Sequence, residues 1–209
     1  MEKVRRNAVD LDARRSRIVE VAADLFREKG LRNISMNDIA NATDLAKPVL
    51  YRAFSSREAL EIAIFEPVIQ LIRTARNKES SRPGAHVFTL YEQLKPHQSA
   101  ALLVLRDCRV SPAHAHWFKR SRQIVAERLW EAFRPTLDAP KGGGKRGRLA
   151  ALWMSSFYVE TLAGWLQNED GLTDQQRVEW ITDVVRAWWT AARREYQLGE
   201  VDFDNPPAC

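Results

Sequence analysis

Apolar residues recur at intervals of three and four positions along most of the chain, a spacing typical of amphipathic helices and not of strands. The first clear stripe consists of Ile18, Ala22, Leu25 and Phe26. It predicts a helix that begins at Arg14 and ends at Gly30, where a glycine suits a left-handed C-cap. Residues 1–13 show no consistent period, which predicts a mobile basic arm or simply a disordered terminus.

Two short helical patterns joined by a tight turn follow in residues 35–54. Ser35 suits the N-cap of the first, because its hydroxyl can accept from the free N–H groups of the opening turn. In the second, Leu50 and Phe54 lie four residues apart and face inward, which leaves Lys47, Val49, Tyr51 and Arg52 on the opposite face. The pattern predicts a helix-turn-helix whose outer face can enter a DNA major groove.

The three N-terminal helices share a small predicted core. Its members are Ile18, Leu25, Phe26, Ile34, Ile39, Leu50 and Phe54. A core of this size is thin for independent stability, so we expect support from the next helix. That connecting helix is predicted over residues 55–80, with Ser55 or Ser56 as its cap and a kink at Pro67.

Helix-length apolar segments continue to the end of the chain. We predict helices at 85–94, 98–109, 112–134, 147–168 and 173–197, a flexible basic loop at 138–147 and a disordered tail at 199–209. The predicted fold class is therefore all-α. It divides into an N-terminal arm and DNA-binding head, residues 1–54, and a helical body, residues 55–198.

Composition narrows the class of protein. Of the 209 residues, 45% are hydrophobic and 28% are charged, as in an ordinary globular protein, and no run has the apolar length of a membrane span. The N-terminus lacks the apolar region of a signal peptide, so we expect a cytoplasmic location. Cys108 and Cys209 are then expected to be two inert thiols.

Net charge points modestly to a polyanionic partner. The formal charge is +5, and residues 1–60 hold 12 Lys and Arg against 9 Asp and Glu. The N-terminal part is therefore more basic per residue than the rest, as a phosphate-facing module should be.

Five of the seven tryptophans fall in the last two predicted helices. Apolar residues there cover more than one face, so the stripes are either buried within one chain or form a symmetric interface with a second copy. We favour the interface, because palindromic half-sites require two DNA-binding heads. Its predicted members are Trp165, Ile181, Val185, Trp188 and Ala192.

The order of these elements resembles the tetracycline-repressor (TetR) family of bacterial transcription regulators. Residues 18–30 resemble the first helix of that family, Ser35-x-x-Asp38-Ile39-Ala40 its second, KPVLYRAF at 47–54 its recognition helix, and SREAL at 56–60 the entry to its fourth. The body is similar only in length and helical content. Two residues depart from the family pattern, since Asp44 stands where glycine is usual and Ala46 where serine is usual.

The resemblance implies roles for individual residues of the head. Lys47, Tyr51 and Arg57 would touch phosphate, and Ser35 would bond at the DNA backbone, contacts that position a protein without reading sequence. Arg52 and Val49 would read bases, through guanine and a thymine methyl respectively. Pro48 fits the start of the recognition helix, and Thr43 and Asn37 are further candidates for DNA contact.

The resemblance also implies a ligand pocket in the body that changes the spacing of two heads. Aromatic residues that can line it are Phe65, Phe88, Tyr91, Trp117, Phe118, Trp153 and Phe157, with His86, His114, Tyr158 or Gln167 as polar groups. For each aromatic residue, simple core packing is the interpretation we favour.

Together these observations predict a ligand-responsive regulator, a repressor that binds a palindromic operator as a homodimer and is released by a small, largely apolar ligand. We expect no catalytic residues, cofactor or metal site, because the four histidines lack a visible nucleophile partner. The alternative is an all-helical ligand carrier or enzyme without DNA binding.

Overall fold

The computed structural model describes residues 2–76, 82–137, 143–168 and 170–196, and these ranges contain helices and no strand. The elements in order are α1 (Glu2–Lys29), α2 (Met36–Ala42), α3 (Lys47–Ala53), α4 (Arg57–Thr74), α5 (Pro83–Leu94), η1 (Lys95–His97), α6 (Gln98–Leu105), η2 (Asp107–Val110), α7 (Ala115–Leu137), α8 (Gly143–Gln167) and α9 (Asp174–Tyr196). The prediction of an all-α fold is confirmed.

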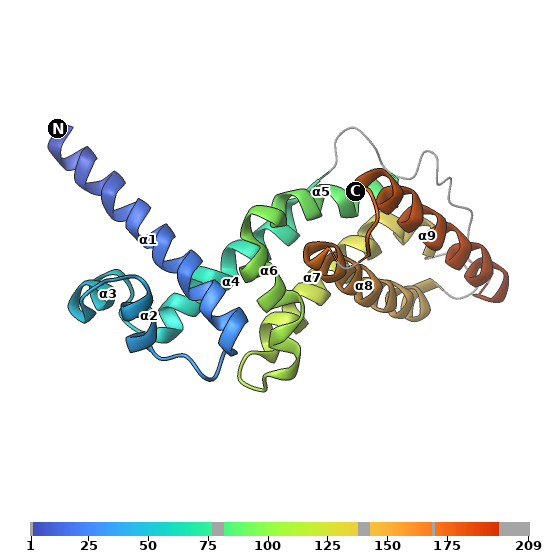
Figure 1. Ribbon diagram of the computed structural model, residues 1–209. Helices are drawn as coiled ribbons and strands as arrows, with labels where there is room; N and C mark the ends of the chain where they lie inside the picture. The colour runs from blue at the N-terminus through green and yellow to red at the C-terminus, as the bar shows by residue number, and fades with distance from the viewer. Residues whose placement is uncertain (1, 77–81, 138–142, 169, 197–209) are drawn as a thin grey trace.

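The helices form a head of α1 to α3 and an elongated body, with α4 running from one into the other (Figure 1). Within the body α7 packs along α8, and α5 packs along α9. The C-terminal half of α1 packs on α6, and α4 packs on both α6 and α7. No helix of the described residues is long and apolar enough to cross a membrane.

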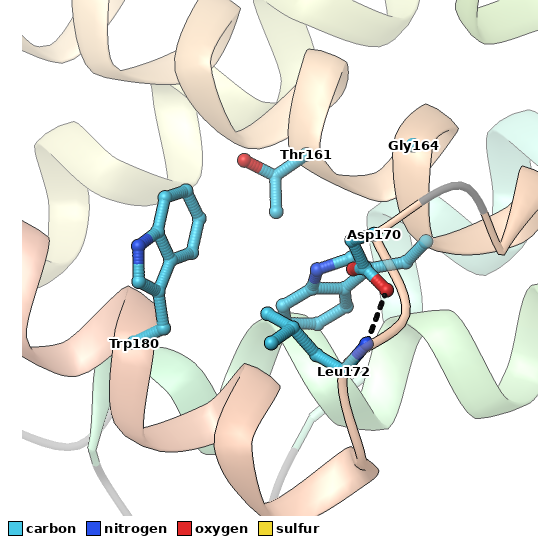
Figure 2. A pocket seen from close by; sticks show the side chains of 6 residues that line it. Thr161, Gly164, Asp170, Leu172 and Trp180 are labelled. Carbon is cyan, nitrogen blue, oxygen red and sulfur yellow. Dashed lines mark hydrogen bonds between the residues drawn. The ribbon is translucent and has the colours of Figure 1, made fainter.

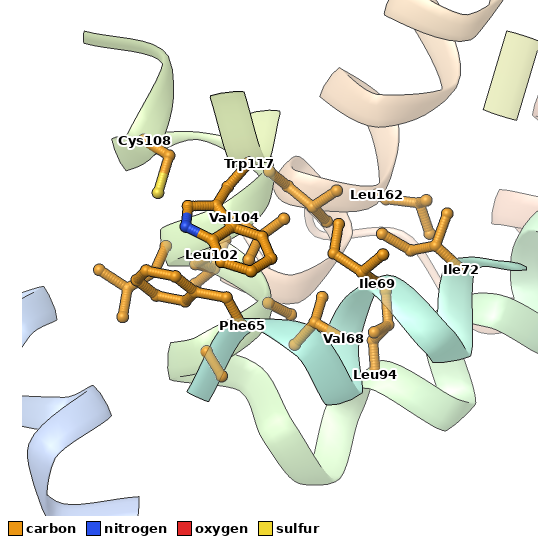
Figure 3. Packing of buried hydrophobic residues seen from close by; sticks show 14 of the residues in the cluster. Phe65, Val68, Ile69, Ile72, Leu94, Leu102, Val104, Cys108, Trp117 and Leu162 are labelled. Atoms are coloured by element: carbon orange, nitrogen blue, oxygen red, sulfur yellow. The ribbon is translucent and has the colours of Figure 1, made fainter. Parts of the chain in front are cut away.

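One hydrophobic cluster runs through head and body. All the residues predicted for the head core are buried except Leu25, which is half-buried. The same cluster continues through Leu60, Ile64 and Phe65 of α4 into the body, so the thin head core is supported as expected. In the body, Phe65, Ile69 and Ile72 face Trp117, Leu162 and their neighbours (Figure 3). The boundary between residues 54 and 55 stays a proposal, because this core crosses it.

Several predicted boundaries are wrong. Helix α1 begins at Glu2 and not at Arg14, because residues 2–13 contain no glycine or proline and are rich in helix-forming residues. The segment 98–109 is split, since Arg106 leaves the helical region with φ −132° and ψ −60° and η2 then carries Cys108 into the core.

The third error concerns the loop predicted at 138–147. Helix α8 begins at Gly143, so the last residues of that segment belong to a helix. Gly147 is buried, and the Arg148 guanidinium lies 5.0 Å from the centre of the Trp130 ring of α7. These contacts hold the helix start against its neighbour despite the glycines. Residues 138–142 and the predicted tail lie outside the described residues.

Helix α4 begins after Ser56, whose hydroxyl accepts the Ala59 N–H at 3.1 Å, as predicted. It ends at Thr74, short of the predicted residue 80. The helix continues across Pro67, and the kink there stays a prediction.

Helices α5 and α9 approach closely at Gly84. The Gly84 N–H donates to Thr182 Oγ1 at 3.2 Å, and a Cβ built on Gly84 would lie 2.0 Å from the carbonyl oxygen of Val178. No side chain fits at that distance, so this crossing requires glycine.

The turn between α8 and α9 is held by a buried arginine, Arg177, which is 2% exposed. Its guanidinium donates to Asp170 at 2.8 Å, to Asn168 at 2.7 Å and to the Tyr91 hydroxyl at 3.2 Å. Because Arg177 donates to it, the Asp170 carboxyl has a pKa below its usual value. The arginine therefore joins α9, the turn and α5.

Candidate nucleic-acid interface

The entry to α2 is fixed by a reciprocal cap. The Asp38 N–H donates to Ser35 Oγ at 3.3 Å, and the Ser35 N–H donates to Asp38 Oδ2 at 2.7 Å. Hydrogen bonds from the Ser35 hydroxyl and N–H lower the pKa of Asp38, since they stabilise its charged form. The predicted cap at Ser35 is confirmed, and the exposed Ser35 side chain is used within the helix start.

The turn between α2 and α3 contains Asp44 in the left-handed region, with φ 53°. The residue therefore supplies the conformation for which glycine is usual, at a cost that aspartate tolerates better than most residues. Thr43 before it is 8% exposed, and its hydroxyl donates to the Ile39 carbonyl at 2.7 Å. The Thr43 hydroxyl thus stabilises the end of α2, and its contact with DNA stays a prediction.

Helix α3 presents one face to the core and one to the outside. Leu50 and the following Phe54 are buried, at 0% and 2% exposure. On the other face Lys47, Pro48, Arg52 and Tyr51 are exposed, Tyr51 by 47%, while Val49 is half-buried. Ala46 caps the helix without a side-chain hydrogen bond, and proline occupies the first turn. The structure thus brings the predicted residues of α3 together on one surface, and their contacts with DNA stay predictions.

Asn37 is exposed on α2 and remains available to a partner, whereas Arg57 is half-buried and bonded within the head. The Arg57 guanidinium donates to the carbonyl oxygens of Leu31 and Ile34 and to Glu61 Oε1, the last at 2.8 Å. It also stacks on the Phe26 ring at 5.1 Å. Arg57 therefore ties the segment before α2 to α4, and its contact with a DNA phosphate stays a prediction.

A second arginine that supports α3 was missed. Arg15 of α1 donates to the Ala53 carbonyl at the end of α3 and lies 4.4 Å from the centre of the Phe54 ring. The available signal was its position, three residues before Ile18 on the core-facing side of α1. A basic side chain can hydrogen-bond the free carbonyls at the end of a helix, as Arg15 does here.

Within the described part of the chain, the aromatic residues predicted for a ligand pocket lie in separate places, and the pocket stays a prediction. Phe65 and Trp117 are buried against each other, with ring centres 5.4 Å apart, and Phe118 is half-buried on the same helix as Trp117. Phe88 packs on Tyr91 at 5.6 Å, within the α5 side of the body. Core packing accounts for these residues, as favoured above, whereas Trp153 is 64% exposed and cannot line an enclosed pocket.

Four residues of the predicted dimer interface are buried within the single chain, and their part in an interface stays a prediction. Trp165, Ile181, Val185 and Ala192 are at most 6% exposed within the single chain, so they offer little surface to a second copy. Trp188 is half-buried. The apolar stripe of α9 packs on α5, where the arginine-held turn folds α9 back on the body.

A different apolar surface lies over α8 and α9, and we name it the α8–α9 face. Trp153 and Trp180 protrude from it, the latter 45% exposed, and Phe157 packs on Trp180 at 5.9 Å. Two hollows flank them. One, of about 280 Å³, is lined by Thr161, Gly164, Trp165, Asp170, Leu172 and Trp180 (Figure 2), and the other, of about 180 Å³, by Trp153, Met154, Phe157, Val184, Val185 and Trp188. Both are smaller than typical ligand pockets.

Cys108 is a buried residue of the body. Burial, followed by the nearby Asp107 and Glu61 carboxylates, raises the pKa of its thiol to about 12. The thiolate is therefore absent at neutral pH, as expected of an inert cysteine. Cys209 lies outside the described residues.

Comparisons with known proteins match the head directly. Residues 18–64 match the model of the bacterial regulatory proteins of the tetR family. The HTH-type transcriptional activator FasR of Mycolicibacterium smegmatis is 25% identical over 84% of this chain and 82% of its own length. An uncharacterised HTH-type transcriptional regulator of Mycobacterium tuberculosis is 28% identical over 84% of this chain and 76% of its own.

Solved structures share the fold over most of the chain. A regulator from Pseudomonas aeruginosa PAO1, 16% identical, superposes with a TM-score of 0.64 over 88% of this chain and 94% of its own. FadR of Bacillus subtilis, solved with stearoyl-CoA and 19% identical, has a TM-score of 0.54 over 79% of this chain and 96% of its own. At these identities the likeness establishes the fold alone.

Proposed function

Because the chain belongs to the TetR family of bacterial transcription regulators, we propose that it binds a palindromic operator as a homodimer and responds to a small, largely apolar ligand. The observation that carries DNA binding is the exposed face of α3. Lys47, Tyr51 and Arg52 lie there together, on a helix that Leu50, Phe54 and Arg15 anchor to the head. Such a helix can insert into a major groove without rearranging the core.

Replacing Arg52 with alanine is expected to weaken operator binding by roughly 5- to 150-fold, equivalent to about 1–3 kcal/mol, because it removes a base contact. Lys47→Ala should instead weaken binding to all sequences and lower the salt slope by about one unit, because one DNA phosphate is no longer neutralised. Fluorescence anisotropy with DNA from upstream of the protein's own gene, titrated at several salt concentrations, measures both. Lys145→Ala, an exposed lysine at the start of α8, serves as the control. Equal affinities for Arg52→Ala and the control would contradict the assignment.

We propose that the α8–α9 face joins the two protomers. Trp153 and Trp180 are knobs on a surface that also carries two hollows, and a two-fold axis would place the knobs of one chain against the hollows of the other.

Trp153→Glu is therefore expected to convert the dimer to a monomer at micromolar concentration, because it buries a charge in an apolar interface. Sedimentation velocity measures the two species. Val110→Glu is the matched control, since Val110 is also apolar and is 75% exposed, but lies on η2. A dimer that survives Trp153→Glu as it survives Val110→Glu would rule out this face.

The proposed ligand would occupy the body near α5. His86 there has two buried ring nitrogens without a hydrogen-bond partner among the described residues. Desolvation, followed by the nearby Arg128 and Arg76, lowers the pKa of His86 and keeps the ring neutral. A buried polar group of this kind is normally satisfied, so a hydrogen-bonding group of a ligand is a suitable partner. Acyl-CoA thioesters are reasonable first compounds to test, because FadR of Bacillus subtilis was solved with one.

Repression, a cytoplasmic location and the lack of enzymatic activity complete the proposal. The relative FasR is named an activator, so the sign of regulation needs its own measurement. A reporter gene fused to the operator, assayed with and without the protein, gives that sign directly.

A further inference from the structure

A continuous line of hydrogen bonds crosses from the body to the head through Glu61 of α4. One carboxylate oxygen of Glu61, Oε1, accepts from Arg57 Nε at 2.8 Å, and the other, Oε2, lies 3.2 Å from His114 Nε2. The His114 Nδ1 lies 2.8 Å from Ser111 Oγ. We call Ser111, His114, Glu61 and Arg57 the junction line. The Glu61 and His114 side chains are 13% and 10% exposed, so water competes little for these bonds.

At its head end the line holds the segment that leads into α2. Arg57 donates to the carbonyl oxygens of Leu31 and Ile34, while Phe26 covers its guanidinium. Ser35, the cap of α2, follows Ile34 directly. The direction in which α2 and then α3 leave α1 therefore depends on where Arg57 places these two carbonyls.

At its body end the line holds the start of α7. A carboxylate only accepts hydrogen bonds, so His114 donates through Nε2–H to Glu61. In the neutral ring Nδ1 must then accept from the Ser111 hydroxyl. The His114 N–H also donates to the Ser111 carbonyl at 2.9 Å, and the His114 ring lies edge-on to Phe65. The Trp117 N–H donates to the His114 carbonyl at 2.9 Å, so His114 is bonded to the first turn of α7.

Two arginines of α7 also bind α4, at residues of α4 that lie beyond Glu61 along the helix. Arg120 pairs with Glu66 at 2.6 and 3.0 Å, and Arg128 donates to the Ile72 carbonyl at 2.6 Å. These bonds hold α4 and α7 together within the body. The junction line extends that connection to the head.

We propose that Glu61 and His114 are positioning residues for DNA binding: they fix Arg57, and through it the start of α2, relative to the first turn of α7. A displacement of α7 in the body is thereby passed to the DNA-binding head. This inference rests on the proposed function, because it assigns a route by which the body controls the same DNA-binding surface.

The test is a double-mutant cycle on operator affinity. His114→Phe keeps the ring volume and removes both hydrogen bonds, and Arg57→Met removes the bonds to the carbonyls. If the residues act through one line, the loss in the double variant falls short of the product of the single losses by at least about threefold. Lys47 lies on α3 outside the junction line. In the second cycle, His114→Phe combined with Lys47→Ala, the two losses of operator affinity should therefore multiply. Multiplication in both cycles would overturn the proposal.

Arg120→Met is the matched body control, since it also breaks a bond between α7 and α4. Hydrogen exchange of the amides of residues 30–36 provides a readout that needs no DNA. Protection there should fall in His114→Phe and Ser111→Ala and stay at the wild-type level in Arg120→Met. Ser111→Ala removes only a hydroxyl, so it remains informative if the phenylalanine variant does not fold. Equal exchange in Ser111→Ala and Arg120→Met would contradict the proposal.

Glu61→Gln separates positioning from charge. A glutamine can accept from Arg57 and donate to His114 Nε2, whereupon Nδ1 becomes the protonated nitrogen and donates to Ser111. Operator affinity should stay within about threefold of wild type, while imidazole ¹⁵N shifts report the exchanged tautomer. If the His114 tautomer is unchanged in Glu61→Gln, the proposed hydrogen bond between residue 61 and His114 is contradicted. If wild-type protein binds no DNA, the proposed function fails, whereas the exchange and NMR results still decide whether the line exists.

Discussion

Phe65→Ala is expected to lower the free energy of unfolding by about 3–5 kcal/mol, because the truncated side chain leaves a cavity at the centre of the body. Phe65 is 0% exposed, and its ring packs edge-on against Trp117 with centres 5.4 Å apart. Urea denaturation followed by circular dichroism gives the free energy. The size of the effect also separates two interpretations of this aromatic residue, because a side chain that lines an open ligand pocket loses less packing when it is shortened.

Ile62→Ala supplies the comparison for Phe65→Ala. Ile62 lies on the same helix α4 but is 46% exposed, so its truncation should cost well under about 1 kcal/mol, as most surface substitutions do. Similar losses in the two variants would show that Phe65 is not part of the packed core.

Arg177→Met is expected to cost about 3 kcal/mol of stability, because the methionine replaces the apolar part of the side chain but leaves the Asp170 carboxylate without its partner. That carboxylate is 25% exposed, so water compensates it only in part. Asn168 and the Tyr91 hydroxyl lose a donor at the same time. Thermal unfolding compared with Arg186→Met, an exposed arginine of the same helix, measures the difference. A loss no greater than that of Arg186→Met would contradict the structural role.

The same pair predicts a dependence on pH. The Asp170 carboxyl has a lowered pKa in the folded protein, so its contribution is present above the unfolded pKa of about 3.9 and is lost as the pH falls through the folded value. Arg177→Met should therefore flatten the loss of stability below about pH 4. Unfolding curves at neutral pH and at about pH 3 for both proteins test this, and an equal acid loss in the variant would exclude the pair as a contributor.

Local features of the head were predictable because they depend on neighbours in sequence. Gly30 ends α1 with φ 86°, Ser35 caps α2, and Asp44 adopts the left-handed conformation, each as its residue type and position indicate. Leu50 and Phe54 are buried because helical periodicity distinguishes the two faces of α3. Even the absence of a side-chain cap at Ala46 follows from its methyl group.

Contacts between distant segments were not predictable in the same way. Periodicity shows that Ile181 and Val185 are buried but not whether another helix of the same chain or a second chain covers them. Arginine is a residue type that often contacts phosphate, yet the Arg57 guanidinium donates to two carbonyls 26 and 23 residues earlier in the chain. The start of α1 was missed because helix propensity without an apolar stripe leaves no periodic signal.

The close crossing at Gly84 restricts how this sequence can change over generations. Any replacement places a carbon atom 2.0 Å from the Val178 carbonyl oxygen and pushes α5 and α9 apart. Because α9 also carries Trp180, moving α9 away from α5 would displace Trp180 and change the α8–α9 face. Any substitution of Gly84 is thus expected to destabilise the protein at once, whereas exposed positions elsewhere on the body tolerate substitution.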